Sequence, residues 1–557
     1  MPSLEQSSVS DLIKMRSSKL EQRDTRQRAR ELKHLDELIK AVGFHAERRD
    51  CNARVAINRL PAEVLREIFT TSCTVKLAQY RSLHYYCNDI TTIWNPTWIE
   101  KGRAVTLMLV CYHWKEIALE IQELWKGVES YWGHQDHTLL ERSGRGPLKV
   151  LIRGDLEPSC AVAHVLHNVE HSSRIQELYW ILGSAHKDLR MPAPSLRSLA
   201  LRSYPSQIPD ESLKLFGNHT PCLERLSLSC AGWLPSNAFA NLTSLAIEYC
   251  YVTKSCAKIR SLLAGTLNLV DLILRDVAGN NFPHVRVEIG AASMKSVSLA
   301  QLRRLLIEDM RTDDIDYVFR DARLNEDLSV SIKHRPGSDE QRLLEVVSTW
   351  SLNALKQPKE LHFQQHVAVI AGASSGFRFE VRRSMTLEDW TTLDWPRILP
   401  LSSISHLCVF QDARRLPGLE RVYNLFGKMT VLQTLSVNID GLTEIVDALT
   451  SFRDPIDPPL CPTLTTLRIV IWKDSDCDII LDSVLPHRAQ LGVKHLYIGL
   501  IDPQLSEDWR PRQVVEDQFH GKFESVNFEM LLSGNEYGIT LPPVCDEEAH
   551  ALWTPWL

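Results

Sequence analysis

The chain has 557 residues, of which 44% are hydrophobic and 24% are charged, and it carries a formal net charge of −6. That length allows several ordinary domains or one long repeat array. The slightly acidic balance argues against a general electrostatic grip on nucleic acid, which needs a basic surface. No apolar run approaches the ~18–20 residues that span a bilayer, and the polar stretch 1–21 is unlike a secretory signal.

The 13 cysteines are scattered along the chain, with no Cys-x-x-Cys pair and no Cys/His cluster at zinc spacing. The sequence also has no Gly-x-x-x-x-Gly-Lys-Ser/Thr loop for phosphates and no His-Glu-x-x-His motif. We therefore expect no metal, no cofactor and no catalytic residues. An odd number of scattered cysteines is more typical of a reducing compartment than of a disulfide framework. This favours the cytoplasm, the nucleus or both.

Residues 1–54 are expected to contain a helix. The stretch 10–50 lacks proline, and apolar residues recur three or four positions apart at Leu32, Leu35, Ile39 and Val42. Two interpretations stay open: the helix forms a short coiled coil and self-associates, or it is a solvated helix that lies against the module following it.

Two amphipathic segments come next. Pro61 stands where a helix would begin, a place that needs no backbone N–H, and Glu63 falls in the first turn, where negative charge suits the helix dipole. Apolar residues then recur at helical spacing, at Val64, Leu65, Ile68 and Phe69. The second segment has the same spacing at Trp114, Ile117, Ala118 and Ile121, and it closes with Leu124-Trp125.

These segments resemble an F-box, in the form found in the large F-box families of mushroom-type fungi. The match rests on Leu-Pro-x-Glu-Val-Leu at 60–65, Ile68-Phe69, Val-Cys-x-x-Trp at 110–114 and the closing Leu-Trp. The resemblance implies a helical module that binds the SKP adaptor of cullin-based (SCF) ubiquitin ligases. It also implies a set of adaptor-binding residues, divided between the module's own core and the interface: Leu60, Pro61, Val64, Leu65, Ile68, Phe69, Val110, Cys111, Trp114 and Trp125.

The module, which we place at 55–132, departs from the compact F-box pattern in one respect. About 40 residues separate Phe69 from Val110, where the family needs far fewer. The insertion, at about 73–104, is rich in aromatic residues, which predicts that it packs. These residues are Tyr80, Tyr85, Tyr86, Trp94 and Trp98.

From about 148 onward the pattern apolar-x-x-apolar-x-apolar keeps returning, often after a turn residue. The triads are Ile175, Leu178, Trp180; Leu196, Leu199, Leu201; Leu223, Leu226, Leu228; Leu242, Leu245, Ile247; Leu269, Leu272, Leu274; Leu302, Leu305, Ile307; Ile404, Leu407, Val409; Leu432, Leu435, Val437; Leu464, Leu467, Ile469; and Val493, Leu496, Ile498. This pattern is typical of leucine-rich repeats.

In such a repeat the last two apolar residues alternate on a short strand and point inward. One copy cannot bury its inner face alone, so copies stack and their strands line up as a parallel sheet. The positions between the apolar residues face out on the concave side and are candidates for contacting a partner. We single out Glu224, Arg225, Ser227, Asp271, Arg303 and Arg304 as candidate target-binding residues.

The repeats, placed at 148–502, are irregular, and the triads lapse at about 310–400. In that interval 338–356 is predicted to form one amphipathic helix, and 367–370 with 377–381 a pair of strands. The tail, 503–557, ends in an apolar patch and is expected to cap the repeats, with a docking peptide as the alternative.

The loop 371–376, Ala-Gly-Ala-Ser-Ser-Gly, resembles the glycine-rich turn of short-chain dehydrogenases, which binds a dinucleotide where a strand enters a helix. However, Arg378 stands in place of the third glycine. A strand-like alternation follows the loop instead of a helix, so a Gly/Ser hairpin loop is the better interpretation.

The expected fold class is α/β: an N-terminal helix and an all-helical F-box module, followed by an irregular leucine-rich-repeat solenoid, a horseshoe with a parallel β-sheet. Proteins with this resemblance are substrate receptors, which bind the SKP adaptor and, through it, a cullin, while the repeats hold a protein target. Catalysis of ubiquitin transfer lies in other subunits, so the receptor acts through proximity. The alternative is a non-catalytic repeat scaffold without a ligase role. Neither a membrane nor a nucleic acid is expected as a partner.

Overall fold

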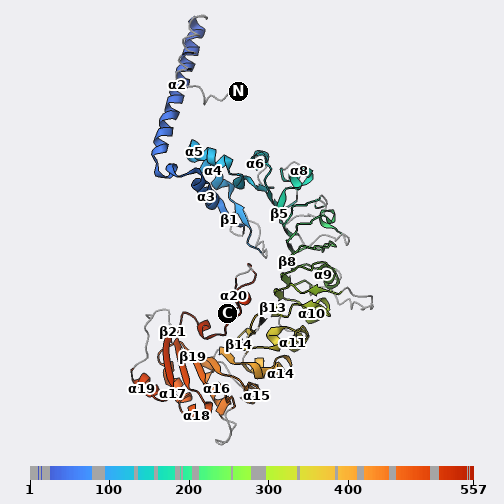
Figure 1. Cartoon of the computed structure of the whole chain (residues 1–557), viewed down its shortest axis with the longest axis vertical. Helices are drawn as coiled ribbons and strands as arrows, with labels where there is room; N and C mark the ends of the chain where they lie inside the picture. The colour runs from blue at the N-terminus through green and yellow to red at the C-terminus, as the bar shows by residue number, and fades with distance from the viewer. Residues whose placement is uncertain are drawn as a thin grey trace. The chain divides into compact units, whose positions relative to one another are not determined.

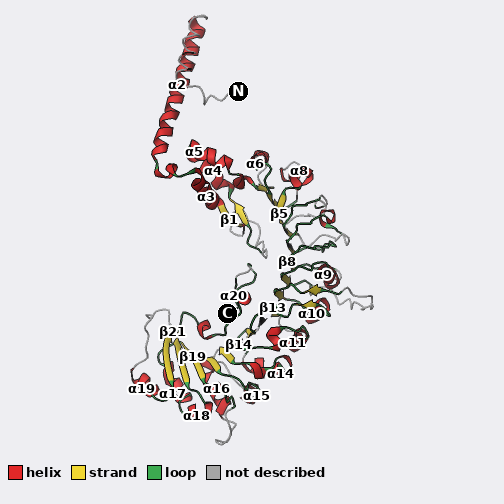
Figure 2. Ribbon diagram, viewed as in Figure 1, coloured by secondary structure: helices red, strands yellow, loops and turns green. Residues whose placement is uncertain are grey.

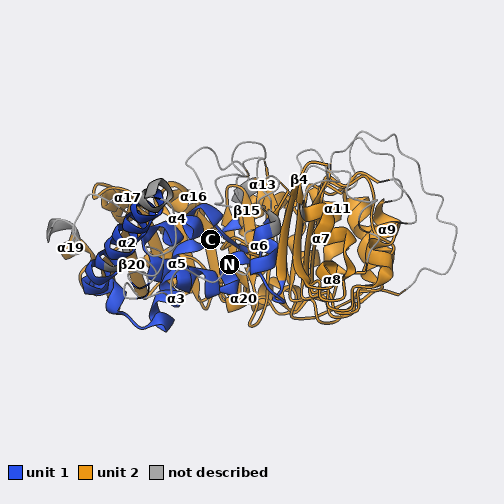
Figure 3. Ribbon diagram, turned by 90° about the horizontal axis from the view of Figure 1, so that it is seen from above, with its two compact units in different colours: residues 1–86, 97–128, 135–147 blue, residues 87–96, 129–134, 148–557 orange. Residues whose placement is uncertain are grey.

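The computed structural model describes residues 11, 14, 25–77, 94–130, 136–155, 161–181, 189, 192–203, 213–252, 255–277, 296–334, 339–382, 385, 387–410, 419–450, 460–501, 513–547, 550 and 552–556. The chain forms two compact units (Figure 3). Unit 1 contains 1–86, 97–128 and 135–147, and unit 2 contains 87–96, 129–134 and 148–557.

Unit 1 is mainly helical (Figure 2). Its helices are α2 (Thr25–Arg54), η2 (Ala56–Arg59), α3 (Ala62–Cys73), α4 (Lys101–Val110), α5 (Tyr112–Glu120), η5 (Gln122–Trp125) and α6 (Asp136–Arg142). Strands β1 (Thr74–Lys76) and β2 (Thr97–Ile99) pair antiparallel. This pair lies in the expected insertion, whose central part, 78–93 with Tyr80, Tyr85 and Tyr86, is outside the described residues.

The sequence signals at 60–125 correspond to helix ends and to a core. Pro61 is the N-terminal cap of α3, and Glu63 lies in its first turn. The two stretches that were separated in sequence share one buried cluster: Leu65, Phe69, Cys73, Ala104, Ile117, Ala118, Ile121, Leu124 and Trp125. Burying apolar surface from α3, α4 and α5 in one cluster holds these short helices together, since helices of this length are marginal alone.

Unit 2 is a mixed α/β structure built on a large, mostly parallel sheet. Its strands are β4 (Leu148–Arg153), β5 (Ile175–Ile181), β6 (Ser198–Arg202), β7 (Arg225–Ser229), β8 (Ser244–Glu248), β9 (Asp271–Arg275), β11 (Arg304–Glu308), β13 (Ser329–His334), β14 (Glu360–Gln364), β15 (Val367–Ala371), β16 (Gly376–Val381), β17 (His406–Phe410), β18 (Thr434–Asn438), β19 (Thr466–Ile471), β20 (His495–Leu500) and β21 (Ser525–Met530). The short β3 (Gly127–Glu129) precedes them, and β10 (Ser298–Leu299) pairs with β12 (Arg323–Leu324) separately.

Within each of two runs of strands, the second apolar residue of a triad aligns across the sheet with that of the next triad. Leu178, Leu199, Leu226, Leu245, Leu272 and Leu305 are consecutive register partners, and so are Leu407, Leu435, Leu467 and Leu496. All ten are essentially inaccessible to solvent. Because side chains alternate along a strand, the residues just before and just after each of these leucines in its own strand lie on the opposite side of the sheet. We call that side the front face.

Helices follow one another along the side away from the front face, as α9, α10, α11, α14 and α15 do in Figure 1. The helices of unit 2 are α7 (Ala161–His167), α8 (Val169–Ser172), η8 (Leu215–Asn218), α9 (Ser255–Leu263), α10 (Thr312–Phe319), α11 (Glu340–Ser348), α12 (Asn353–Lys356), α13 (Leu387–Thr392), α14 (Trp395–Ile398), η9 (Leu401–Ser403), α15 (Leu419–Phe426), α16 (Ile439–Thr450), α17 (Asp476–Ser483), α18 (Arg488–Leu491), α19 (Gln513–Phe519), η10 (Gly534–Tyr537) and α20 (Pro543–Asp546).

The interval 310–400 was expected to interrupt the repeats, but the sheet continues through it. β13 pairs with β11 and β16, and β14 pairs with β17, all parallel. β15 lies between β14 and β16 and runs antiparallel to both. The predicted strand pair is therefore present, and the interruption is a change of direction in one strand.

Two boundaries differ from the sequence expectation. The helix predicted over 338–356 is divided into α11 and α12, because Ser351 adopts a left-handed φ of 58° and Trp350 turns in to pack on Phe319, with ring centroids 5.1 Å apart. The sheet also extends beyond 502, since β21 pairs with β20. Charged and polar residues flank Val526 and Phe528, so this strand has no clear triad.

Candidate functional site

Two apolar strips are exposed on the helices of unit 1. The first is on α3, where Val64 and Ile68 are four residues apart and therefore share one side of the helix, and the exposed Leu60 lies just before that helix. The second follows α4 and the start of α5, with Val105, Leu109, Val110 and Tyr112. Leu109 is 79% exposed. Half of the large apolar side chains that are exposed in the described part of the chain lie between Val55 and Tyr112.

The buried cluster explains why these strips are unusual. On α3, Leu65 and Phe69 point into the core while Val64 and Ile68, beside them in sequence, point out. A helix that only closes a core needs one apolar side. A second apolar side gathered on neighbouring helices is typical of a surface that binds another protein.

The structure divides the ten expected adaptor-binding residues into three groups. The exposed group is Leu60, Pro61, Val64, Ile68 and Val110; the half-buried group is Cys111 and Trp114; the buried group is Leu65, Phe69 and Trp125. Sequence reasoning did not select Val105, Leu109 or Tyr112 for this set. The four-residue spacing of Val105 and Leu109 was the available signal.

The half-buried and buried residues shape the module. The Trp114 indole N–H donates to Oδ1 of Asn58 at 2.6 Å, and its ring lies 4.8 Å from that of Phe69. The Trp125 indole N–H donates to the carbonyl of Ala118 at 3.0 Å. Sγ of Cys111 accepts the Trp114 backbone N–H at 3.5 Å and so caps α5. These contacts position the strips.

The candidate target-binding residues of unit 2 do not all share the front face. Arg225 and Ser227 on β7, Asp271 on β9 and Arg304 on β11 alternate with the aligned leucines, whereas Glu224 and Arg303 precede their strands. Ser227 is buried. Glu224 pairs with Arg197 at 3.3 Å. Arg304 donates to Asp271 at 2.5 Å and also lies 3.8 Å from Glu547 of the C-terminal segment.

A chain of ion pairs crosses the front face farther along the same strands. Arg275 contacts Glu248 at 3.0 Å and Glu308 at 2.6 Å, and Lys333 contacts Glu380 at 2.9 Å. Burial works to lower the pKa of Arg275, but Glu308 and Glu248 raise it above its ordinary value. Sequence reasoning missed this network, because its members become neighbours only through the register of the parallel strands.

His406 bridges a carboxylate and a hydroxyl, as in a hydrolase triad. Its Nδ1 lies 3.1 Å from Oε2 of Glu360, and its Nε2 lies 2.9 Å from Oγ of Ser436. However, Ser436 is buried in the middle of β18. It is in register with Cys408 and Arg468 on the neighbouring strands, so the backbone N–H groups around it are used in the hydrogen bonding of the sheet. Such a nucleophile would have neither access nor an oxyanion hole.

The glycine loop also spells Gly-x-Ser-x-Gly over Gly372–Gly376, the pattern of a nucleophile elbow. Ser374 lies between the antiparallel strands β15 and β16, not between a strand and a helix, and its hydroxyl donates to Asp327 at 2.5 Å. The hairpin predicted from the sequence is present. The strand-to-helix geometry that a dinucleotide turn or a nucleophile elbow requires is not formed at this loop.

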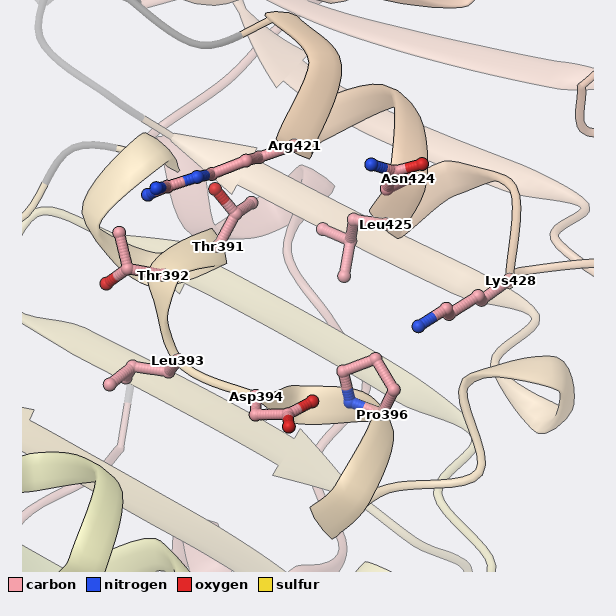
Figure 4. Close-up of a pocket in the computed structure, with 9 residues that line it drawn as sticks. All are labelled: Thr391, Thr392, Leu393, Asp394, Pro396, Arg421, Asn424, Leu425 and Lys428. Carbon is pink, nitrogen blue, oxygen red and sulfur yellow. The ribbon is translucent and has the colours of Figure 1, made fainter.

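A cavity of about 540 Å³ opens among α13, α14 and α15. Figure 4 shows Arg421 and Lys428 on one side, opposite Thr392, Asp394 and Pro396. Asp394 is paired with Arg397 at 2.7 Å, while Arg421 is exposed on α15 and Lys428 is exposed in the turn that follows α15. Exposed cations without a buried polar partner do not define a ligand class.

Comparison with known proteins leaves the family open: no family model matches this chain, and no curated protein matches it significantly. Within the described residues, no helix has the length and apolar character needed to cross a membrane. In the same residues no three His, Cys, Asp or Glu side chains are grouped so that they could hold a metal ion.

Proposed function

We propose that this chain is a substrate-recognition subunit of an SCF-type ubiquitin ligase. In this proposal residues 55–132 form an F-box module, and its two apolar strips bind the SKP adaptor, which is anchored on a cullin. Unit 2 is an irregular leucine-rich-repeat solenoid that holds a protein target. The chain works in the cytoplasm, the nucleus or both, and ubiquitin transfer is catalysed by other subunits.

One observation supports this proposal above the others. The residues that resemble an F-box include a group that folds into the core and a group that is exposed as apolar strips, with Val64 and Ile68 in one strip and Val110 in the other. An interface of this kind gains most of its affinity from a few apolar anchors at its centre.

The test is an affinity measurement between the full chain and a purified SKP adaptor. The variant Val64→Asp/Leu109→Asp places one charge in each strip, and Leu267→Asp, an exposed leucine of unit 2, is the matched control. The proposal expects binding by the wild type and the control, and at least about a hundredfold loss in the double variant, since each anchor is worth about 2 kcal/mol or more.

Circular dichroism of each variant separates lost binding from lost folding. A well-folded wild type that does not bind the adaptor contradicts the proposal, and so does a double variant that binds normally. Adaptor binding without co-purification of a cullin would favour the alternative, a repeat scaffold that takes no part in ubiquitination.

A further inference from the structure

The C-terminal segment of unit 2 crosses the front face of the sheet in its described residues, 531–547, 550 and 552–556, and we call it the strap. Leu531 and Tyr537 pack at Gly499 of β20, where a Cβ would lie 2.3 Å from Leu531 and 2.9 Å from Tyr537. The backbone N–H of Thr540 then donates to Oε2 of Glu360 on β14 at 2.7 Å. Figure 1 places this end of the chain on the side of the strands away from the helices.

The strap continues along one row of register partners. Ser329 on β13 is in register with Arg304 on β11, and Arg304 with Asp271 on β9. Sγ of Cys545 lies 3.4 Å from Oγ of Ser329, and Glu547 reaches Arg304. The strap thus meets β14, β13 and β11 in turn, and on β11 it reaches Arg304, one of the positions that the sequence singled out for a target.

At Gly376 of β16, the row leaves space for an aromatic ring, because glycine has no side chain. A Cβ there would lie 2.7 Å from the Trp556 ring and 2.8 Å from Sγ of Cys545, so a larger side chain would displace them. The Gly376 N–H donates to Oγ of Ser329 at 3.1 Å. Trp556 is buried, and its ring lies 5.4 Å from that of Trp553.

The strap rests on the sheet without becoming part of it. After Leu531, the described part of the chain gives the strap no strand pairing with the sheet, whose own strands pair residue by residue. In the described residues the strap is held by side chains, of which Tyr537, Cys545 and Trp556 are buried, and by the backbone N–H of Thr540. The strap can therefore leave the sheet without breaking any strand pairing, although its departure would expose apolar side chains such as Val544, Trp553 and Trp556.

We propose that the row Asp271, Arg304, Ser329 and Gly376 is a peptide-docking groove, and that the strap is its occupant until a target peptide of the same chemistry replaces it. That peptide is extended, seats an aromatic side chain over Gly376 and places a carboxylate near Arg304. The inference rests on the proposed function for the role of unit 2 as a target receptor. A tethered strap competes at an effective concentration of about a millimolar. It therefore lowers the apparent affinity of the groove for any other peptide.

The experiment uses the full chain and, as the probe, a fluorescein-labelled synthetic peptide with the sequence of residues 538–557. In the variant Trp556→Ala/Glu547→Gln the strap loses its ring and its carboxylate while the groove is unchanged. The matched control, Thr554→Ala/Asp546→Asn, changes exposed neighbours of the same strap. We expect the first variant to bind the probe at least tenfold more tightly than the wild type and the control do. Adding Gly376→Leu to the first variant should abolish that binding.

Equal probe binding by the wild type and the first variant would overturn the proposal, as would binding that survives Gly376→Leu. If the first variant does not fold, amide exchange in the wild type decides. Strap amides that exchange at least tenfold faster than those of β11 and β13 support a displaceable strap, whereas equal protection makes it part of the core and overturns the proposal. Adaptor binding by the wild type tests unit 1 alone, so a chain whose variants bind the probe as expected but that does not bind the adaptor counts only against the ligase role.

Discussion

Sγ of Cys545 lies 3.4 Å from Oγ of Ser329, although 216 positions separate the two residues in the chain. Both side chains are buried. The contact joins the strap to the row of front-face residues on β13, and the same Ser329 hydroxyl accepts the N–H of Gly376. One serine therefore connects the C-terminal segment, strand β13 of the parallel sheet and the hairpin of β15 and β16.

The reactivity of Cys545 should report whether the strap is docked. Burial raises the pKa of Cys545 from 9.0 to about 12. Since each unit changes the thiolate fraction tenfold, the docked thiol at pH 8 should hold about a thousandth of the ordinary thiolate. We expect iodoacetamide to modify the exposed Cys51 and Cys222 well before Cys545, as followed by peptide mass spectrometry. Equal rates at Cys545 and Cys222 would show that the strap is not docked in solution.

The neighbours Val64 and Leu65 should separate binding from folding in unit 1. Leu65 is fully buried, so Leu65→Ala should lower the free energy of unfolding by about 2–5 kcal/mol. Val64 is 42% exposed, so Val64→Ala should change it by less than about 0.5 kcal/mol. Denaturant titration measures both. We expect Val64→Ala to weaken adaptor binding nonetheless, and a stability loss equal to that of Leu65→Ala would show that Val64 belongs to the core.

The ion pairs of the front face give a second matched comparison. Glu248 is 0% exposed and faces Arg275, whereas the pair of Arg197 and Glu224 is exposed. Arg275→Met would remove the guanidinium that faces the buried Glu248 carboxylate, and breaking a buried ion pair costs about 3–5 kcal/mol. Arg197→Met should cost less than about 1 kcal/mol. Thermal unfolding of the two variants checks this, and equal losses would mean that Glu248 is hydrated in solution.

The sequence predicted the strands of the parallel sheet well, because each triad carries its signal locally. Each triad marks a strand, and register partners such as Leu226 and Leu245 follow from stacking copies of one pattern. The triad pattern does not predict β13. Val330 and Ile332 alternate as in the other strands, but Asp327 occupies the first position of the triad, where an apolar residue is expected. The inserted β15 could be predicted as a strand, but its place between β14 and β16 depends on contacts distant in sequence.

The candidate sites were less accessible to sequence reasoning. Leu65 and Val64 are chemically similar, and only the packing of α3 on its neighbours decides which one is exposed. Asp271 and Arg304 could be placed on one face from the triads, but nothing in the local pattern indicates that Glu547 approaches Arg304. A free terminal segment has no periodicity, so its position depends on single contacts such as the space at Gly376.

Acidic pH should release the strap through His550. Burial lowers the pKa of His550 to about 4, and its Nδ1 accepts the backbone N–H groups of Leu552 and Trp553 at 3.2 and 3.0 Å. Protonation would place a donor where two donors already point. Of the charged groups that face it, Asp271 on β9 raises its pKa and Arg304 on β11 lowers it.

The sign follows from linkage. A released His550 titrates near 6.5, so below that pH the released strap binds a proton that the docked strap does not bind until about 4. Docking is therefore strongest above about 6.5 and weakens as the pH falls toward 4. His362 of β14 is also buried with a pKa of about 4, so the sheet itself loses stability over the same range. The readout must therefore be the ratio of amide protection factors, strap to β11, at pH 7.5 and pH 5. We expect the ratio to fall in the wild type and to change less in His550→Gln; a ratio independent of pH in the wild type would show that His550 does not control docking.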